Sequence, residues 1–443
     1  MGKKWQIIII LTLSLLTRFI FFGHPNETIF DEVHFGKFIS GYYTREYFFD
    51  IHPPLGKLAI AGFAKLFDFK PEFAFTDIGD KYPDKQYMIL RFLPSLAGAL
   101  LPVVIYLLLI QVGLNPLASF LGGLLIVFEN ALLAQSRYIL LDSFLLLFGF
   151  LSFLLYFKSK DQTSYPKLHL ILFGFFAGLA VSVKWTGLSF LMLPLLFEFI
   201  QVIRTKSFKK VFTVLIPPFL IACLVYFVIF LAHLTLLNKS GQGDPFMSIG
   251  FQKTLIGNRY ADDKATPSNI FQKFTELNAE MYKANQRLTA EHPYSSPWYS
   301  WPLMTRPIYY WVNANERIYL IGNPIIWWAS AVALLVFVLS LLKNLKSKTI
   351  NNLSIFLITG YVINILPFIG VKRVMFLYHY FTAYIFAIMI LAWLINQRKN
   401  PKIIFGVLMT IIVLSFLFFS PLSYGLELSP KAYETRVWFN SWK

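Results

Sequence analysis

An adjacent acid pair, Asp31-Glu32, opens the densest polar stretch of a sequence that is otherwise mostly apolar. The stretch covers residues 30–58, and apolar runs lie before and after it. It goes on to hold two imidazoles, another acid and two amines, namely His34, His52, Asp50, Lys37 and Lys57. Carboxylates and imidazoles are the side chains that most often transfer protons in catalysis. We therefore expect this stretch to be a catalytic loop.

Charged residues also occur in or beside the later apolar runs, where they are costly and usually paired or functional. They are Arg18, Arg91, Glu129, Arg137, Asp142 and Lys184. Arginine and lysine bind phosphate well, and a carboxylate can take a proton from an attacking hydroxyl. Gathered in one cavity at one membrane face, such groups would suit transfer of a sugar from a lipid phosphate to an alcohol.

Several of these charges have an equally good structural interpretation. Arg18 could extend its head group to the interface or pair with Glu27. Arg137 and Asp142 are five residues apart, so they align poorly on one helix, and a structural ion pair with Glu129 is the alternative.

Lys184 precedes Trp185, and the two together could simply anchor the membrane interface. His34 and His52 could suggest zinc, but no further ligands follow at a recognisable spacing. We therefore expect no metal site from these residues, and a requirement for a divalent cation stays open.

The composition is that of a membrane protein. Of the 443 residues, 56% are hydrophobic and only 14% are charged, whereas soluble proteins carry about 25% charged residues. The single cysteine, Cys223, rules out a disulfide framework. A formal charge of +17 would suggest nucleic acid in a soluble protein. Here it follows from the lysines and arginines that collect on the cytoplasmic side of membrane proteins, so no nucleic-acid partner is expected.

About eleven apolar runs approach the length of about 20 residues that a spanning helix needs. They lie near 5–22, 87–110, 117–134, 138–157, 168–183, 186–203, 211–233, 324–342, 353–370, 378–395 and 403–420. A shorter apolar run, 55–67, has helical spacing and is expected to lie in the interface.

The distribution of lysine and arginine predicts the topology. If the N-terminus is cytoplasmic, every second loop is rich in these residues, and the loops between mix both signs. The first outer loop is then 23–86, the large outer loop is 234–323, and the C-terminus lies outside. The predicted fold is an all-α polytopic membrane protein in the cell membrane, with one membrane-embedded domain over 1–443.

Six motifs, in chain order, resemble those of the protein O-mannosyltransferases, which are membrane glycosyltransferases of the GT-C fold. They are DEVHFGKFISGYYTREYFFDIHPPLGKL from Asp31, RFLP from Arg91, QSRYILLDS from Gln135, SVKWTGL from Ser182, LTAEHPYSSPWYSWPLMTRPIYYW from Leu288 and YHYF from Tyr378. The resemblance implies a polyprenyl- or dolichyl-phosphate-mannose donor and a protein Ser or Thr hydroxyl as acceptor, with inversion at the anomeric carbon. It also leaves open a dimer.

The resemblance implies roles for particular residues as well. Asp31 would be the general base, supported by Glu32. The candidates for binding the donor phosphate are Arg91, Arg137 and Lys184, and the supporting residues are His52, Asp142, Arg373 and His379. Asp142 would orient Arg137 or Lys184. His292, Pro293 and Tyr294 would face the acceptor.

One feature departs from the family. Eukaryotic members insert a β-trefoil domain in the large outer loop, and 234–323 is too short to hold it. This favours a bacterial or archaeal type, and it leaves a lipid or cell-wall acceptor as an alternative. A secondary transporter or flippase is the remote alternative, because the chain lacks the two similar halves that are typical of transporters.

Overall fold

The computed structural model of the chain describes residues 2–161, 165–287, 292–347, 351–371 and 373–443. Within these residues, nine helices are long and apolar enough to cross a membrane, and a bent pair of shorter helices raises the number to ten. They are built on α4 (Tyr87–Gln111), α7 (Asp142–Ser159), α8 (Pro166–Val183), α9 (Leu188–Thr205), α10 (Ile216–Leu236), α13 (Pro324–Ser347), α14 (Asn352–Ile363), α15 (Phe381–Asn396) and α16 (Pro401–Tyr424). The spans of α14 and α15 reach sufficient length only with the short helical turns beside them, as Asn352–Ile369 and Leu377–Asn396. The chain is a multi-pass membrane protein.

The two remaining predicted spans are also helical. The first is α1 (Lys3–Phe19), which packs against α4 and α5. The second is the bent pair α5 (Pro116–Val127) and α6 (Asn130–Ser136), whose axes differ by 57°. Glu129 sits at the bend and caps α6, because its carboxylate accepts the Leu132 N–H at 2.6 Å.

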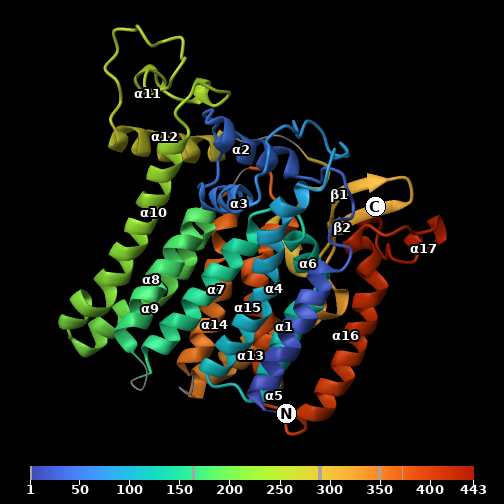
Figure 1. Cartoon of the computed structure of the whole chain (residues 1–443). Coiled ribbons are helices and arrows are strands. Elements are labelled where there is room, and N and C mark those ends of the chain that lie inside the picture. The colour runs from blue at the N-terminus through green and yellow to red at the C-terminus, as the bar shows by residue number, and fades with distance from the viewer. Residues whose placement is uncertain (1, 162–164, 288–291, 348–350, 372) are drawn as a thin grey trace.

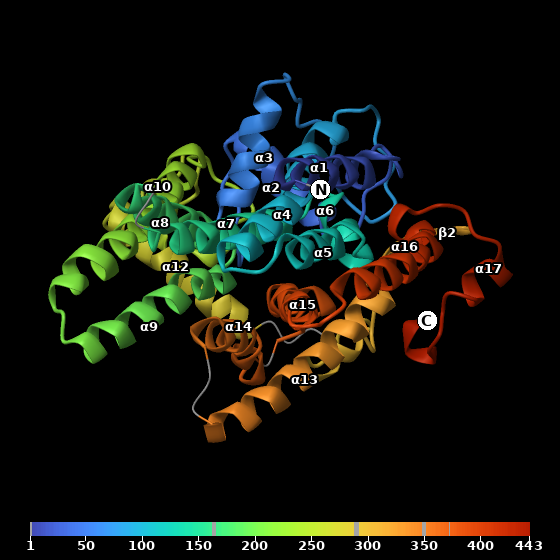
Figure 2. The same ribbon diagram turned by 90° about the horizontal axis from the view of Figure 1, so that it is seen from below.

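The helices form a bundle with a buried centre. Most of α4, α7 and α15 is buried, whereas α10, α13 and α16 lie at the periphery. Figure 2 shows α8, α9 and α10 at one side of α7, and α13 and α16 beyond α15. Small residues permit the closest contacts: a Cβ at Gly174 would lie 2.5 Å from the Pro218 carbonyl oxygen, so α8 and α10 can approach only with glycine there.

A layer of short elements covers one end of the bundle (Figure 1). It contains α2 (Glu32–Thr44), α3 (Leu55–Lys65), α11 (Ile249–Gln252), α12 (Ile270–Arg287), β1 (Ile308–Asn313), β2 (Glu316–Leu320) and α17 (Pro430–Glu434). The C-terminus lies near this layer, and the N-terminus lies at the other end of the bundle. The helix predicted in the first outer loop is α3.

Two features of this layer differ from the sequence prediction. The stretch expected to be a catalytic loop contains helix α2, because Phe35, Ile39 and Tyr42 recur at helical spacing and are all buried. The fold is also not purely helical, since β1 and β2 pair as an antiparallel hairpin. The register of the hairpin shifts between Tyr309 and Trp311, which makes Tyr310 an extra residue in a β-bulge.

Candidate functional site

Asp31 stands at the N-terminal end of α2 with a free carboxylate. Its side chain makes no capping hydrogen bond to the helix, and its carboxylate has no hydrogen-bond partner in the described part of the chain. Partial burial raises the pKa of Asp31 to about 7, against the opposing charge of Lys184 and with help from the Asp142 carboxylate. An unengaged carboxyl group with a pKa near neutrality is suited to general base catalysis.

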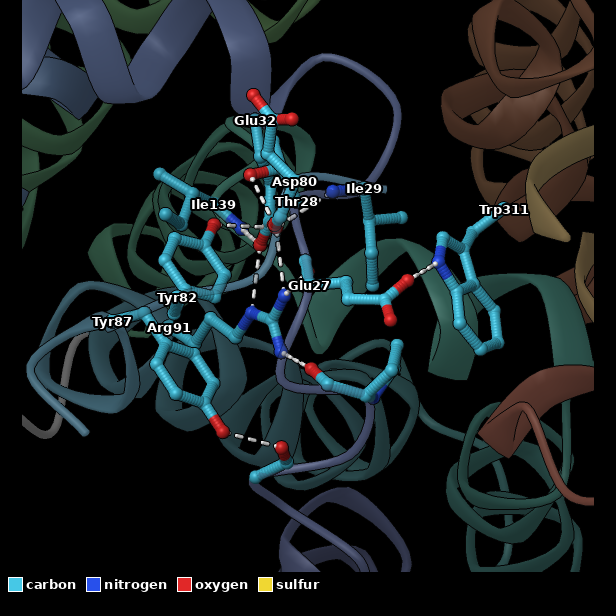
Figure 3. Close-up of polar contacts among 12 residues, drawn as sticks. Glu27, Thr28, Ile29, Glu32, Asp80, Tyr82, Tyr87, Arg91, Ile139 and Trp311 are labelled. Carbon is cyan, nitrogen blue, oxygen red and sulfur yellow. Dashed lines mark hydrogen bonds and ion pairs between the residues drawn. The ribbon is translucent and has the colours of Figure 1, made fainter. Parts of the chain in front are cut away.

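Glu32, the other half of the acid pair, is fully buried and fully engaged. Its carboxylate accepts hydrogen bonds from Nε and Nη2 of Arg91, both at 2.7 Å. It also accepts the Tyr82 hydroxyl and the backbone N–H groups of Ile29 and Ile139, each at 3.0 Å (Figure 3). Glu32 therefore ties α2 to α4 and to the segment after α6, and it fixes the backbone that carries Asp31.

Arg91 is equally enclosed. Besides Glu32, its guanidinium donates to the carbonyls of Pro25 and Glu27, at 2.7 and 2.8 Å. The rings of Tyr82 and Tyr87 lie 5.5 and 4.8 Å from it, as cation–π partners. Figure 3 shows it surrounded by these groups. Arg91 is fully buried, so it offers no free donor to a ligand.

Arg18 and Arg137 cap the ends of neighbouring helices. Arg137 donates to the carbonyls of Arg18 and Ile20, each at 2.7 Å, and to that of Phe21 at 2.6 Å, where α1 ends. Arg18 donates to the last carbonyls of α5, and so it neither extends to the interface nor pairs with Glu27. Cations are favourable at helix C-termini because the carbonyls there lack helical partners.

A cavity of about 420 Å³ opens between α7, α9, α14 and α15, near Asp31. Five residues predicted from sequence line it, namely His52, Asp142, Lys184, Arg373 and His379. The remainder of the wall is mostly apolar, and includes Leu145, Leu188, Met192, Pro367, Phe368 and Phe381. The cavity thus combines a polar part with an apolar wall, as a ligand with a charged head and a hydrocarbon tail would require.

Two cations lie in the polar part of this cavity. Lys184 donates to both carboxylate oxygens of Asp142, at 2.8 and 2.9 Å. Arg373 donates to Asn285 at 2.7 Å and lies 3.0 Å from Nε2 of His379. Within the described residues Arg373 has no carboxylate partner, so its positive charge is available to an anionic ligand.

His52 lies beside these cations, in the loop between α2 and α3. Lys57 and Asp50 form a buried ion pair, and the Lys57 ammonium also donates to the His52 carbonyl at 3.0 Å. Burial, followed by the charges of Lys184 and Arg373, lowers the pKa of His52 well below its ordinary value. His52 is therefore a neutral hydrogen-bonding group.

The block expected to face the acceptor lies at the edge of the same region. The His292 ring is 4.9 Å from that of Phe376, and the Tyr294 ring is 5.3 Å from that of Tyr309. The Pro293 carbonyl accepts a hydrogen bond from Arg306 at 2.9 Å. The first residues of the block, 288–291, lie outside the described residues.

The structure thus separates the predicted site residues into three groups. Asp31 and the five cavity residues come together, and the acceptor-side residues 292–294 lie at the edge of that region. The side chains of Glu32, Arg91 and Arg137 bind other groups of the protein. Three contributors were not predicted, namely Gln135, Asn285 and Tyr310. Gln135 belongs to the QSRYILLDS motif and Tyr310 to the motif that starts at Leu288, so both could have been found there, but Asn285 lies in none of the six motifs.

No three His, Cys, Asp or Glu side chains approach one another closely enough to hold a metal ion, as far as the chain is described. Near Asp31, the two further carboxylates that shift its pKa are each paired with a lysine. The residues present therefore supply no ready ligand set for a divalent cation.

The architecture is the GT-C fold of polytopic membrane glycosyltransferases. The structure of ArnT from Cupriavidus metallidurans bound to undecaprenyl phosphate superimposes with a TM-score of 0.55 over 95% of this chain and 66% of that one, at 13% identity. The Archaeoglobus fulgidus oligosaccharyltransferase in its apo form gives a TM-score of 0.57 over 99% and 58%, at 11% identity. These similarities concern the fold alone.

The family follows from the sequence. The model of the dolichyl-phosphate-mannose-protein mannosyltransferase family matches residues 8–238, just over half of the chain. A second model, the C-terminal four TMM region of protein-O-mannosyltransferase, matches 270–442. The chain belongs to the protein O-mannosyltransferase family.

Characterised relatives agree with this assignment. Dolichyl-phosphate-mannose–protein mannosyltransferase 1 of Candida albicans is 34% identical over 59% of this chain, and enzyme 4 of Schizosaccharomyces pombe is 32% identical over 67%. The chain spans only 31% and 40% of these relatives' own lengths. The Saccharomyces cerevisiae Pmt1-Pmt2 complex bound to the sugar donor has a TM-score of 0.92, over all of this chain and 93% of that one, at 21% identity.

Proposed function

We propose that this protein transfers mannose from a polyprenyl- or dolichyl-phosphate-mannose donor to Ser or Thr hydroxyls of proteins, with inversion at the anomeric carbon. Membership of the family supports the reaction class. The observation that carries the proposal is the free carboxylate of Asp31, with a pKa of about 7, beside a cavity that holds two cations and has an apolar wall.

Lys184 and Arg373 are the proposed ligands of the donor phosphate. Asp142 fixes the position of the Lys184 ammonium, while Arg373 provides a positive charge that no described carboxylate neutralises. The apolar wall along α9 and α14 would receive the first isoprene units. Arg91 and Arg137, which the sequence also suggested for the phosphate, have their guanidinium groups occupied by carboxylate and carbonyl oxygens, so we assign them to the scaffold.

The proposed chemistry is a single displacement. The acceptor oxygen attacks the anomeric carbon as its proton passes to the Asp31 carboxylate, and the bond from that carbon to the phosphate oxygen breaks on the opposite side. The leaving lipid phosphate gains negative charge, which Lys184 and Arg373 stabilise. His52 lines the cavity and would donate or accept hydrogen bonds with the sugar hydroxyls. His379 also lines it, but its ring nitrogens already contact Arg373 and the Phe376 backbone, so we assign it to holding Arg373.

The outer layer of short elements is proposed to face the outside of the cell membrane. The N-terminus would then be cytoplasmic and the C-terminus outside, which agrees with lysine- and arginine-rich loops at the N-terminal end of the bundle. His292, Pro293 and Tyr294 would border the path of an acceptor polypeptide. A dimer is proposed by analogy with the Pmt1-Pmt2 complex.

The test uses membranes that contain the wild type or Asp31→Asn, supplied with radiolabelled polyprenyl-phosphate mannose and a Ser/Thr-rich peptide. Wild type is expected to label the peptide. Asp31→Asn is expected to lose at least about a hundredfold in rate, because the proton acceptor is gone. The control is Asp68→Asn, the same substitution at a carboxylate in the same outer loop that is 93% exposed.

Equal rates for wild type and Asp31→Asn would remove Asp31 from its role and keep the enzyme class. Label that moves onto lipid or cell-wall polymer, and never onto peptide, would overturn the protein acceptor. That outcome would support the alternative glycosyltransferase.

A further inference from the structure

Tyr310 occupies an unusual position in the β1–β2 hairpin. Tyr309 pairs with Tyr319 and Trp311 pairs with Ile318, which leaves Tyr310 as the unpaired residue of the bulge. Bulges redirect side chains and free backbone groups from the ladder, and they are frequent beside functional sites. Both effects occur here, because the Tyr310 ring is almost fully buried and its carbonyl accepts the Phe30 N–H at 3.1 Å.

Through Phe30, Tyr310 holds the backbone that presents Asp31. Phe30 directly precedes Asp31 and has a φ of 43°, a left-handed conformation that is costly for a bulky residue. Such a conformation persists only where its surroundings impose it. Tyr310 does so twice, by the hydrogen bond to its carbonyl and by its ring, which stacks on Phe30 at 4.2 Å with 11° between the planes.

Through its hydroxyl, Tyr310 also reaches the cation pair of the cavity. The hydroxyl donates to Oε1 of Gln135, and Nε2 of Gln135 donates to Asp142 at 2.7 Å. Asp142 in turn holds the Lys184 ammonium with both oxygens. Because the Tyr310 hydroxyl occupies the amide oxygen, the amide nitrogen must face Asp142. All members of this chain except Lys184 are almost fully buried.

We propose that Tyr310 is a positioning residue, which holds the general base Asp31 and the phosphate-binding pair Asp142–Lys184 in a fixed relation. Its hydroxyl acts on the proposed phosphate-binding pair through Gln135, and its ring acts on the proposed general base through Phe30. This inference rests on the proposed function for the identity of the two ligands. It predicts that the two halves of one side chain can be separated by substitution.

Tyr310→Phe keeps the ring on Phe30 and removes the hydroxyl. The Gln135 amide is then free to turn its oxygen toward Asp142, which loosens the carboxylate that holds Lys184. We expect the affinity for undecaprenyl phosphate in detergent micelles to fall about tenfold and the KM for the mannosyl donor to rise about tenfold. The kcat should stay within about twofold of the wild-type value. Tyr310→Leu also removes the ring that stacks on Phe30 and so positions Asp31. We therefore expect its kcat to be about tenfold lower than that of Tyr310→Phe.

The matched control is Tyr319→Phe on the paired strand. Tyr319 is an equally buried tyrosine, whose hydroxyl donates to the Trp442 carbonyl at 2.6 Å, away from the cavity. The Tyr319→Phe variant should lose as much thermal stability as Tyr310→Phe does, but its affinity for undecaprenyl phosphate should be unchanged. Gln135→Leu should weaken affinity as Tyr310→Phe does, and the double variant should be no weaker than the weaker single variant, because both act through the same amide.

Equal affinities for Tyr310→Phe and Tyr319→Phe would overturn the inference, and so would additive losses in the double variant. Absence of undecaprenyl phosphate binding by the wild type would overturn it too. If wild type binds this lipid, responds to Tyr310→Phe as expected and transfers no mannose, the proposed function fails while the positioning role stands.

Discussion

Replacing Arg91 by methionine tests whether its guanidinium holds the fold or the substrate. Its four hydrogen bonds go to the Glu32 carboxylate, twice at 2.7 Å, and to the carbonyls of Pro25 and Glu27, at 2.7 and 2.8 Å. Arg91 and Glu32 are both fully buried. The Arg91→Met variant therefore leaves a buried carboxylate with no opposing charge.

The expected cost is a loss of about 3–5 kcal/mol in the free energy of unfolding, as is typical when one partner of a buried ion pair is removed. Water does not screen this ion pair, since both side chains are inaccessible to solvent. Glu32→Gln in the same chain removes the unpaired charge. The double variant should therefore be destabilised by less than the two single variants together, by about 1 kcal/mol or more.

The assay measures denaturant-induced unfolding of the detergent-solubilised protein, and the affinity of the folded protein for undecaprenyl phosphate. Arg373→Gln is the matched comparison. That arginine lines the cavity, and in the described part of the chain its side-chain hydrogen bonds go only to Asn285 and His379, so its loss leaves no buried carboxylate unpaired. We expect Arg91→Met to lose stability and keep its affinity for undecaprenyl phosphate. Arg373→Gln should keep its stability and lose affinity for this lipid.

The result that would refute this reasoning is an Arg91→Met protein as stable as the wild type that no longer binds the lipid phosphate. Arg91 would then contact the donor, as the sequence alone suggested. The assignment of Arg373 would fail if Arg373→Gln bound undecaprenyl phosphate as tightly as the wild type.

Two further predictions follow from the site. A general base works only when deprotonated, so the transfer rate at low donor concentration should rise with pH through about 7, the pKa of Asp31; a flat profile across neutrality in pH-dependent initial rates would contradict this. Arg137→Met leaves the carbonyls of Arg18 and Ile20 at the end of α1 without their donor, whereas the Phe21 carbonyl keeps the His24 N–H. It should therefore cost about 2–5 kcal/mol in unfolding free energy and leave the donor KM unchanged. A raised KM with intact stability would argue that Arg137 meets the phosphate.

Much of the fold could be predicted from the sequence because it depends on local properties. A spanning helix needs only a sufficiently long apolar run, and each of the eleven predicted spans coincides with a helix or with the bent pair α5–α6. The helix α2 was mistaken for a loop because charged residues interrupt its apolar face. The hairpin β1–β2 was missed because short strands rich in aromatic residues resemble interfacial segments.

The candidate site could be predicted only in part. Sequence motifs pointed to Asp31, His52, Asp142, Lys184 and His379, and these lie in or beside one cavity. They could not distinguish Lys184 from Arg91, since both are cations next to apolar runs. The difference lies in what each side chain meets, and for Arg91 the partner is Glu32, 59 residues away in the sequence.

The sequence by itself thus determined the membrane class, the position of the apolar helices and the stretch that carries Asp31, the proposed general base, because apolar length, charge bias and motif order are local properties of the chain. Only the tertiary structure decided which charged side chains bind other parts of the protein and which remain available to a ligand. Hydrogen-bond satisfaction of a buried charge depends on long-range contacts, and those exist only after the helices have packed. Asp31 keeps an unengaged carboxylate, whereas its neighbour Glu32 accepts from Arg91, from Tyr82 and from two backbone N–H groups, and the nearby Lys184 donates to Asp142.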